Sequence, residues 1–340
     1  MMNERHLFYP DLFEPFARLL DLLKRGPVVV FGHARPDGDC IGSQVALCRV
    51  LRTQGVDAVC VNPDPVPRRL EFLVGDTPFL QVDAFTPSGH RAVFVDCADH
   101  KRSGALVKQL FPMPLGNIDH HVSNTRYAEL SLIDDHSAAT GEILTGLFLD
   151  AGLPIDPLSA LGLYVGIATD TGQFCYPSTS RRVFELSGRL LELGARPADA
   201  TAELYEKESF AKLELLGHFL ESFRLECDGR VCVGVLDEEA FRRSGATDED
   251  TEGLVDYARS IEGVDVGVLI EDRPKGIKGS LRSKDPIVRV DRVAKQFSGG
   301  GHACAAGLNT TGPFEVFYPR LISAIGELLM DVDAGRKATP

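Results

Sequence analysis

Short apolar runs that alternate with helix-like spacing fill the first half of the chain. Four apolar runs are short enough to be buried β-strands, at residues 27–32, 56–61, 91–95 and 115–118. Apolar positions three and four residues apart predict three helices, over residues 42–52, 141–152 and 181–194. The apolar stretch 158–168 fits either a buried helix or a strand. This alternation predicts a parallel sheet with helices on both faces, which binds ligands at the carboxyl ends of its strands.

The second half has a different pattern. Residues 196–220 are rich in Glu and Lys at helical spacing, which predicts one long connecting helix. Three apolar runs beyond it predict strands, at residues 230–236, 264–271 and 277–282. Two helices are predicted among and after them, over residues 251–262 and 290–297. The second half is therefore expected to form a smaller α+β domain.

The length of 340 residues exceeds what one hydrophobic core usually holds, so two domains are expected. We expect a ligand cleft between a larger parallel-sheet α/β domain and the smaller α+β domain. The expected order is the α/β domain, a helical linker, the α+β domain and a frayed tail, at residues 1–195, 196–221, 222–332 and 333–340.

Composition narrows the classes of protein. Hydrophobic residues make up 44% and charged residues 25%, an ordinary globular profile. The amphipathic stretch 12–24 contains charged residues, so it is not a secretory signal, and no run approaches the ~18 apolar residues of a membrane span. The eight cysteines lack metal-binding spacing and are expected to be free thiols. We therefore expect a cytoplasmic protein with no membrane partner.

The net charge also limits the partners. Binding to long nucleic acid depends on Lys and Arg displacing counterions, and the formal net charge of this chain is −13. Long duplex nucleic acid is therefore disfavoured, whereas small phosphate ligands remain compatible with the sequence. A homodimer is left open.

Carboxylate and imidazole groups follow the predicted strands and helices of the first domain. Each group stands at the end of an apolar segment, and together they comprise His33, Asp37, Asp39, Asp96, Asp119, His120, His121 and Asp170. Pro36 and Gly38 favour a loop around the first three, able to curl around a cation. Any one cluster alone is also explained as a turn, a helix N-cap or a strand end. Their occurrence together in one domain predicts a metal site, and the mixture of oxygen and nitrogen ligands suits Mn²⁺.

A glycine run marks the second domain. Gly299, Gly300 and Gly301 precede His302 and several small residues. Such a run is either a flexible turn or a set of backbone N–H groups that cradle an anion. Arg282, on the preceding predicted strand, has the chemistry to pair with a phosphate.

Taken in order, these motifs resemble the DHH family of phosphoesterases. The resemblance rests on His33-x-x-x-Asp37-x-Asp39, Asp96, Asp119-His120-His121 and Asp170. In the second domain, residues 279–283 (Gly-Ser-Leu-Arg-Ser) and 297–302 (Phe-Ser-Gly-Gly-Gly-His) resemble the associated DHHA1 substrate domain. Length and motif order most resemble the oligoribonucleases (nanoRNases) that also dephosphorylate adenosine 3′,5′-bisphosphate.

The resemblance implies two divalent metal ions, with Mn²⁺ favoured, and a role for each motif. His33, Asp37 and Asp96 would hold one ion, and Asp39, His120 and Asp170 the second, with Asp96 bridging both. His121 would face the substrate phosphate, and Asp119 would orient an imidazole. Arg102 either holds a phosphate or forms a surface ion pair. The implied substrate-binding residues of the second domain are Arg282, Ser283, Gly299, Gly300, Gly301 and His302.

Other functions share parts of this pattern. A cyclic or linear dinucleotide phosphodiesterase would use the same metal ligands, and so would an inorganic pyrophosphatase, although the second-domain motifs disfavour the latter. A catalytically silent nucleotide-binding module is a third alternative, disfavoured because all the ligand positions are intact. The sequence leaves open the choice among short oligonucleotides, adenosine 3′,5′-bisphosphate and signalling dinucleotides.

Overall fold

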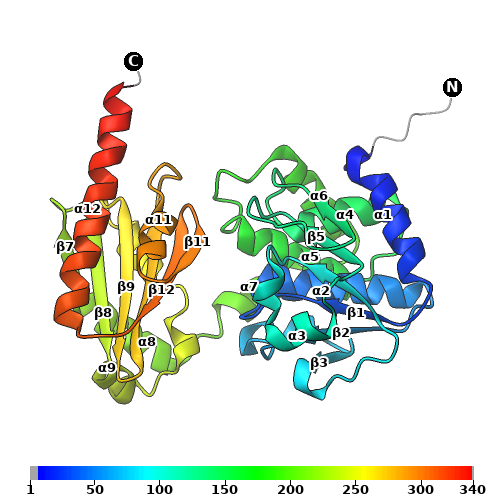
Figure 1. Cartoon of the computed structure of the whole chain (residues 1–340), viewed down its shortest axis with the longest axis horizontal. Helices are drawn as coiled ribbons and strands as arrows, with labels where there is room; N and C mark the ends of the chain where they lie inside the picture. Colours follow the sequence, from blue (N-terminus) through cyan, green and yellow to red (C-terminus); the bar gives the residue numbers. More distant parts are fainter. Residues whose placement is uncertain (1–6, 339–340) are drawn as a thin grey trace. The chain divides into compact units, whose positions relative to one another are not determined.

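The computed structural model describes residues 7–338 and divides into two compact units between Lys207 and Glu208, within the predicted linker (Figure 1). Each unit contains one six-stranded sheet.

The sheet of the first unit is entirely parallel. Its strands are β1 (Val28–Phe31), β2 (Ala58–Asn62), β3 (Phe79–Gln81), β4 (Arg91–Val95), β5 (Gly116–Asp119) and β6 (Leu130–Ile133). The four predicted strands are confirmed, whereas β3 and β6 are short edge strands without a distinct apolar run. The order β3-β2-β1-β4-β5-β6 reverses between β1 and β4, which is where sheets of this kind bind ligands.

Helices and long connections surround this sheet. The α-helices are α1 (Pro10–Leu23), α2 (Gly38–Thr53), α3 (Ala105–Leu110), α4 (Thr140–Asp150), α5 (Pro157–Asp170), α6 (Arg181–Glu192) and α7 (Pro197–Tyr205). Three short 3-10 helices are η1 (Arg68–Leu73), η2 (Val82–Ala84) and η3 (His100–Ser103). The ambiguous stretch 158–168 is therefore helical, and it is apolar because most of its residues are buried.

Alternate residues of β1 face two different cores. Val28 and Val30 pack in the core that contains α1, α2, α4 and α5, while Val29 and Phe31 pack in a second core with Val107 of α3. The prediction of helices on both faces is correct. The two faces are unequal, because one carries the long helices and the other the short α3 with its connections.

Close packing of α2 against α5 positions two of the acidic residues. A side chain at Gly42 would meet the carbonyl oxygen of Gly162 at 2.1 Å, and one at Gly166 would meet Asp39 Oδ1 at 2.5 Å. Only glycine permits so close an approach. It brings Asp39 in the first turn of α2 near Asp170 at the end of α5.

The second unit has a mixed sheet of order β11-β12-β10-β9-β8-β7, in which only the β8–β9 pair is parallel. Its strands are β7 (Arg224–Glu226), β8 (Val231–Asp237), β9 (Val266–Arg273), β10 (Gly276–Ser283), β11 (Gly300–His302) and β12 (Ala305–Thr310). Its helices are α8 (Phe210–Glu221), α9 (Glu238–Ser244), η4 (Asp248–Thr251), α10 (Leu254–Ser260), α11 (Val290–Gln296) and α12 (Phe314–Ala338). One face packs on α11 and α12 and the other on α8, α9 and α10, which gives the expected α+β domain (Figure 1).

Two predictions about connections are wrong. The stretch 196–220 is two helices, α7 and α8, because Ser209 caps a new helix through the backbone N–H of Lys212. Leu215 and Phe219 of α8 are buried in the second unit, so this helix belongs to that core. The predicted tail 333–340 is helical as far as Ala338, since α12 continues through it, and residues 339–340 lie outside the described residues.

All eight cysteines are free thiols, as predicted. Among residues 7–338, the helices are too short or too polar to cross a bilayer.

Candidate metal centre

The predicted ligands meet at the carboxyl edge of the parallel sheet. His33 follows β1, Asp96 follows β4 and His120 follows β5, three strands that are neighbours in the sheet. The Nε2 atom of His33 lies 3.3 Å from Asp96 Oδ2, and that of His120 lies 3.6 Å from Asp96 Oδ1. Asp96 is thus at the centre of the cluster, with one oxygen toward each histidine.

Asp96 is held in an unusual backbone conformation. Its φ angle is +53°, a left-handed region that non-glycine residues seldom occupy. Its backbone N–H donates to Ile118 O on the neighbouring strand at 3.0 Å. Strain of this kind collects at functional sites, where surrounding structure holds one side chain in a required direction.

The predicted loop around Asp37 and Asp39 is in fact the start of α2. Asp37 is the N-cap, and its carboxylate accepts from the backbone N–H of Cys40 at 3.1 Å. Gly38 and Asp39 form the first helical turn, so Gly38 does not interrupt the helix. Asp39 is completely buried there, which is costly unless its carboxylate is hydrogen-bonded.

The N-terminus of α4 holds the Asp39 carboxylate, an interaction that sequence reasoning missed. The backbone N–H groups of Thr140 and Gly141 donate to its two oxygens at 2.7 and 2.8 Å. The Thr140 hydroxyl also donates to Asp96 Oδ1 at 3.2 Å. The two contacts to Asp39 span 101 and 102 residues of sequence and the contact to Asp96 spans 44, so no local pattern predicts them.

The ligand atoms form two groups that share Asp96. In the first group, His33 Nε2 lies 3.7 Å from Asp37 Oδ2 as well as near Asp96. In the second group, His120 Nε2 lies 3.3 Å from Asp170 Oδ2 and 4.0 Å from Asp39 Oδ2. Atoms that share one ion at about 2.0–2.2 Å are separated by about 3.0–3.5 Å. The spacing in both groups is close to that of ligands around a cation.

The imidazole rings are oriented for this role. The Nδ1 atom of His33 lies 2.8 Å from Ala34 O, and that of His120 lies 3.3 Å from Ser137 O. A ligating histidine usually donates its second ring N–H to such an oxygen, which leaves Nε2 free for the metal. Within the described structure, the buried Nε2 of His120 has no hydrogen-bond partner, which a bound cation would supply.

Electrostatics also favour cations at this position. Burial, followed by the charges of Asp96 and Asp170, raises the pKa of Asp39 well above its ordinary value. Burial raises the pKa of Asp170 to about 6, and nearby Asp37 and Asp96 add to the effect although His120 opposes it. Crowded buried carboxylates of this kind are relieved by bound divalent ions. The donor set fits the metal ions of the predicted family.

Cys40 is close to the first group but is a poor ligand candidate. Its side chain lies near His33 and Asp96. Burial raises the pKa of the Cys40 thiol, although neighbouring His33 acts against this shift. Because the thiolate is the form that binds metals, this shift disfavours Cys40 as a ligand relative to Asp37.

His121 points its Nδ1 toward a carboxylate. This atom lies 2.7 Å from Asp119 Oδ1, and the other Asp119 oxygen accepts from the side-chain amide of Asn124. Asp119 is completely buried in β5. The structure therefore pairs Asp119 with His121, while His120 faces the two ligand groups.

The predicted substrate-binding residues are distributed over both units. Arg102 is exposed, and its Nη2 lies 3.3 Å from His33 Nδ1, at the rim of the cluster. Arg282 lies on β10 and donates to Leu281 O at 3.1 Å, while Ser283 beside it is buried. The metal cluster belongs to the first unit, and Arg282 and Ser283 to the second.

The glycine run forms an edge hairpin rather than a loop. Gly300–His302 is β11, paired antiparallel with β12. The backbone N–H of Gly299 donates to Ala294 O at 2.9 Å, so this N–H is already engaged within the second unit. A side chain at Gly299 would meet Gly307 O at 2.1 Å, so glycine is needed there for packing. The side chain of His302 lies outside the described residues.

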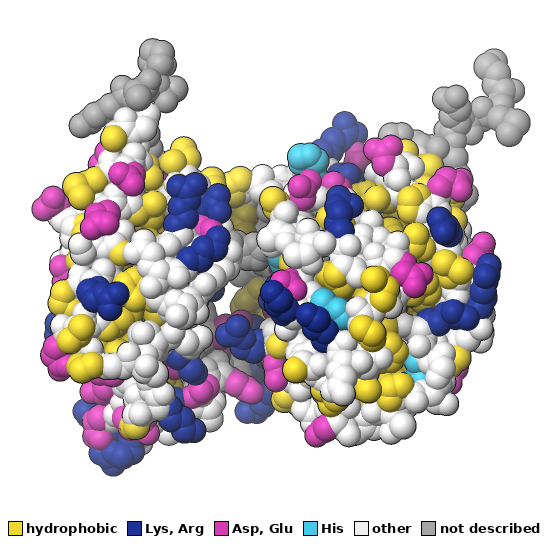
Figure 2. All heavy atoms as spheres, viewed as in Figure 1, with side chains coloured by type: hydrophobic (Ala, Val, Ile, Leu, Met, Phe, Trp, Pro, Cys, Tyr) yellow, Lys and Arg dark blue, Asp and Glu magenta, His cyan; other side chains and the backbone are white. Residues whose placement is uncertain are grey.

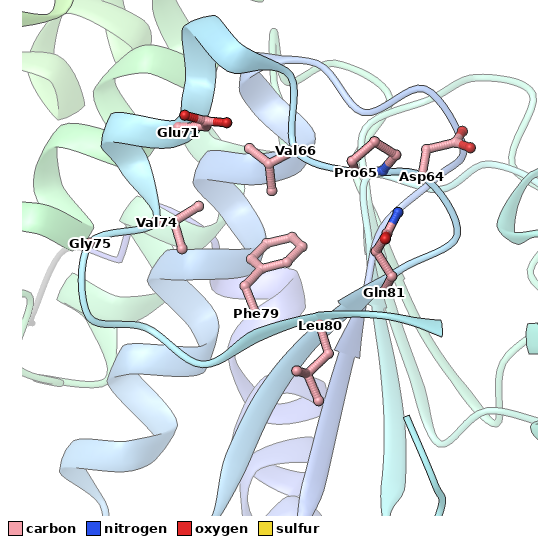
Figure 3. A pocket seen from close by; sticks show the side chains of 9 residues that line it. All are labelled: Asp64, Pro65, Val66, Glu71, Val74, Gly75, Phe79, Leu80 and Gln81. Atoms are coloured by element: carbon pink, nitrogen blue, oxygen red, sulfur yellow. The ribbon is translucent and has the colours of Figure 1, made fainter. Parts of the chain in front are cut away.

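A separate cavity of about 420 Å³ lies in the first unit, between η1 and the β2–β3 edge (Figure 3). It is lined by Asp64, Pro65, Val66, Glu71, Val74, Gly75, Phe79, Leu80 and Gln81. None of the predicted metal ligands lines it. One contact links it to the cluster, because Asp64 accepts from the backbone N–H of Arg35 at 2.7 Å.

The visible surface lacks a long basic track. On the faces shown in Figure 2, Lys and Arg side chains are interspersed with Asp and Glu side chains on each unit. This agrees with the net charge of −13 and with the expectation of small rather than extended phosphate ligands.

Comparison with known proteins gives consistent matches. The model of the DHH family N-terminal domain matches residues 27–167, and the model of the DHHA1 domain matches residues 228–331. A bifunctional oligoribonuclease and PAP phosphatase from Thermus thermophilus is 31% identical over 324 residues, covering 94% of this chain and 96% of that protein. A cyclic-di-AMP phosphodiesterase from Listeria monocytogenes is 28% identical, covering 81% of this chain but only 43% of that protein.

Among solved structures, an exopolyphosphatase-related protein from Bacteroides fragilis has the same fold. Its TM-score is 0.86 at 24% identity, and the match covers 94% of this chain and 97% of that one. The match extends over both units, so the folds of both are known from a solved structure.

Proposed function

The chain belongs to the DHH family of phosphoesterases, a metal-dependent group, and we propose that it hydrolyses short oligonucleotides and adenosine 3′,5′-bisphosphate with two Mn²⁺ ions. The observation that carries the proposal is the position of Asp96, whose two oxygens face the His33 group and the His120 group separately. A carboxylate so placed suits a pair of cations better than a single one. The similarity to the Thermus thermophilus protein supports the substrate class.

Each residue has a distinct part in the proposed reaction. The His33 group and the His120 group would each hold a divalent cation, and such a pair would supply Lewis-acid activation of water and neutralise charge on the phosphate. Asp119 accepts a hydrogen bond from His121 Nδ1 and so orients the ring. A protonated His121 would then donate its Nε2–H to the phosphate or pass that proton to the leaving oxygen. Arg102 at the rim is placed to hold a phosphate oxygen.

The second unit is proposed to hold the distal end of the substrate. Arg282 supplies a positive charge there, and the hairpin of Gly300 and Gly301 with His302 presents backbone N–H groups at a sheet edge.

The eight free thiols support the cytoplasm as the compartment in which the protein acts.

A substrate panel tests the proposal. With Mn²⁺ present, linear dinucleotides and adenosine 3′,5′-bisphosphate are expected to be hydrolysed, and a p-nitrophenyl phosphodiester more slowly. Rates are expected to fall beyond roughly five nucleotides, since single binding modules accommodate about 4 to 16 nucleotides and each added phosphate meets an acidic protein. Chromatography of the products measures the hydrolysis rate for each substrate and chain length. Undiminished cleavage of a 24-mer would contradict the short-substrate proposal, and preference for a cyclic dinucleotide would favour the phosphodiesterase alternative.

Replacing Arg282 with alanine tests the division of labour between the units. Loss of one charge-assisted contact costs about 1.5–3 kcal/mol, so kcat/KM on a dinucleotide is expected to fall about 10- to 150-fold. Hydrolysis of a p-nitrophenyl phosphodiester should change little, because that substrate has no distal nucleotide. Lys278→Ala is the matched control, four residues away on the same face of β10. Equal losses on both substrates would refute the division.

A further inference from the structure

A partly buried polar network lies behind the metal centre, organised around Arg182 of α6. The Nε atom of Arg182 donates to Glu142 Oε1 at 2.7 Å, and its Nη2 donates to Asp134 Oδ2 and to Ser137 Oγ at 3.0 Å each. The guanidinium also lies 4.4 Å from the centre of the Tyr9 ring. One side chain therefore ties together α1, α4, α6 and the segment after β6.

This network holds the segment 134–139 from both ends. Ser137 Oγ donates to Asp134 Oδ2 at 2.6 Å, and Tyr9 Oη lies 2.9 Å from Ser137 Oγ. The backbone N–H of Ala138 donates to Glu142 Oε2 at 2.6 Å. The segment thus has its side chains and its backbone engaged with the partners of Arg182.

The same segment supplies the supports of the second ligand group. The carbonyl of Ser137 lies 3.3 Å from His120 Nδ1 and sets the direction of Nε2. Three residues further on, α4 begins at Thr140, and the N–H groups of Thr140 and Gly141 hold Asp39. His120 and Asp39 belong to one ligand group. The hydrogen-bond partners of Arg182 described above include neither His33 nor Asp37 of the other group.

Removing the charge of Arg182 would disturb this arrangement. Only 1% of the Glu142 side chain is exposed, so without its partner it would be a buried unpaired carboxylate. Breaking such a pair is far more costly than losing a surface ion pair. The segment would have to rearrange to solvate Glu142, and the Ser137 carbonyl and the start of α4 would move with it.

We propose that Arg182 is a positioning residue for the Asp39–His120–Asp170 group, and that it controls the affinity of this one subsite for a divalent cation. The inference uses one part of the proposed function, namely that the His33 group and the His120 group each bind a metal ion. It requires no substrate to be cleaved.

Titration of the metal-free full chain with Mn²⁺ alone, by calorimetry and by electron paramagnetic resonance, tests this inference. Arg182→Met is expected to lower the affinity for one of the two Mn²⁺ ions by about 10- to 100-fold. This is the usual effect of removing a residue that orients a ligand. The affinity that falls should be the same one that falls in Asp170→Asn. The affinity that falls in Asp37→Asn belongs to the other ion, and Arg182→Met should change it by less than about twofold. Arg182→Lys is expected to retain part of the affinity that Arg182→Met loses. Glu142→Gln is expected to lower the affinity for the same ion as Arg182→Met.

Arg49→Met is the matched control, because Arg49 is a similarly covered arginine in the same unit that pairs with Asp156 and Asp76, neither of which is a predicted metal ligand. It is expected to lower the melting temperature of the metal-free protein while leaving both affinities unchanged. Unchanged Mn²⁺ binding in Arg182→Met, equal weakening of both ions, or the same effect in Arg49→Met would overturn the proposal.

If Arg182→Met does not fold, Arg182→Lys and Glu142→Gln are judged by the same criteria. Selective weakening in a chain that cleaves no phosphoester would refute the proposed function and leave this inference standing.

Discussion

Replacing Asp96 with asparagine is expected to lower kcat by at least about 100-fold, equivalent to ~2.7 kcal/mol of lost barrier reduction. The two Asp96 oxygens lie 3.3 Å from His33 Nε2 and 3.6 Å from His120 Nε2, so the carboxylate serves both ligand groups. An amide is neutral and offers a single oxygen acceptor, so both groups lose a charged ligand. Initial rates on a dinucleotide at saturating Mn²⁺, together with metal content, measure the effect.

Asp150→Asn is the control for this variant. Asp150 is also buried, with 3% exposure, and accepts from the backbone N–H groups of Phe8 and Tyr9, at the far end of α4 from the ligands. It is expected to retain most activity even if stability falls. An Asp96→Asn enzyme that keeps more than about a tenth of the wild-type kcat would rule out the bridging role.

Replacing His121 with alanine is expected to reduce kcat by about 10²- to 10⁴-fold, the range typical of a lost acid–base group, while metal content stays near normal. His121 Nδ1 is 2.7 Å from Asp119 Oδ1 but 3.5 Å from Asp96 Oδ1, so its stronger contact is with the orienting carboxylate rather than with the bridging ligand. Elemental analysis beside steady-state kinetics separates binding of metal from turnover.

His90→Ala serves as the control, because His90 lies away from the cluster and packs on Phe85 with ring centres 4.9 Å apart. Loss of one ion in His121→Ala would show that His121 is a ligand and that the roles of His120 and His121 are interchanged. Asp119→Asn should reproduce part of the kinetic defect, since the amide no longer stabilises a charged imidazole.

Local patterns predicted much of this protein because they depend on neighbours in sequence. The apolar runs that became β1, β2, β4 and β5 must be buried, and a polar residue that follows a buried strand emerges at its edge. His33, Asp96 and His120 were therefore recognisable as site residues from their place after apolar runs. The DHH and DHHA1 motifs added the family and the expected pairing of ligands with ions.

Other features depended on contacts between distant segments. The stretch 158–168 is part of helix α5, which packs on α2 through Gly42 and Gly162. The spacing of apolar residues in the sequence does not predict this contact. The same packing drew Gly38 and Asp39 into α2, where a loop had been expected. The break near Ser209 followed from the burial of α8 in the second core.

The sequence by itself thus determined which side chains of the first unit make up the candidate site, because segment ends and residue chemistry are local properties. Only the tertiary structure decided how these side chains are divided and held. It placed β1, β4 and β5 side by side. It paired Asp119 with His121 rather than with His120, and it brought the N-terminus of α4 into contact with Asp39. The physical reason is that an isolated buried charge or unpaired N–H is costly, so each is satisfied by whichever partner packing brings near.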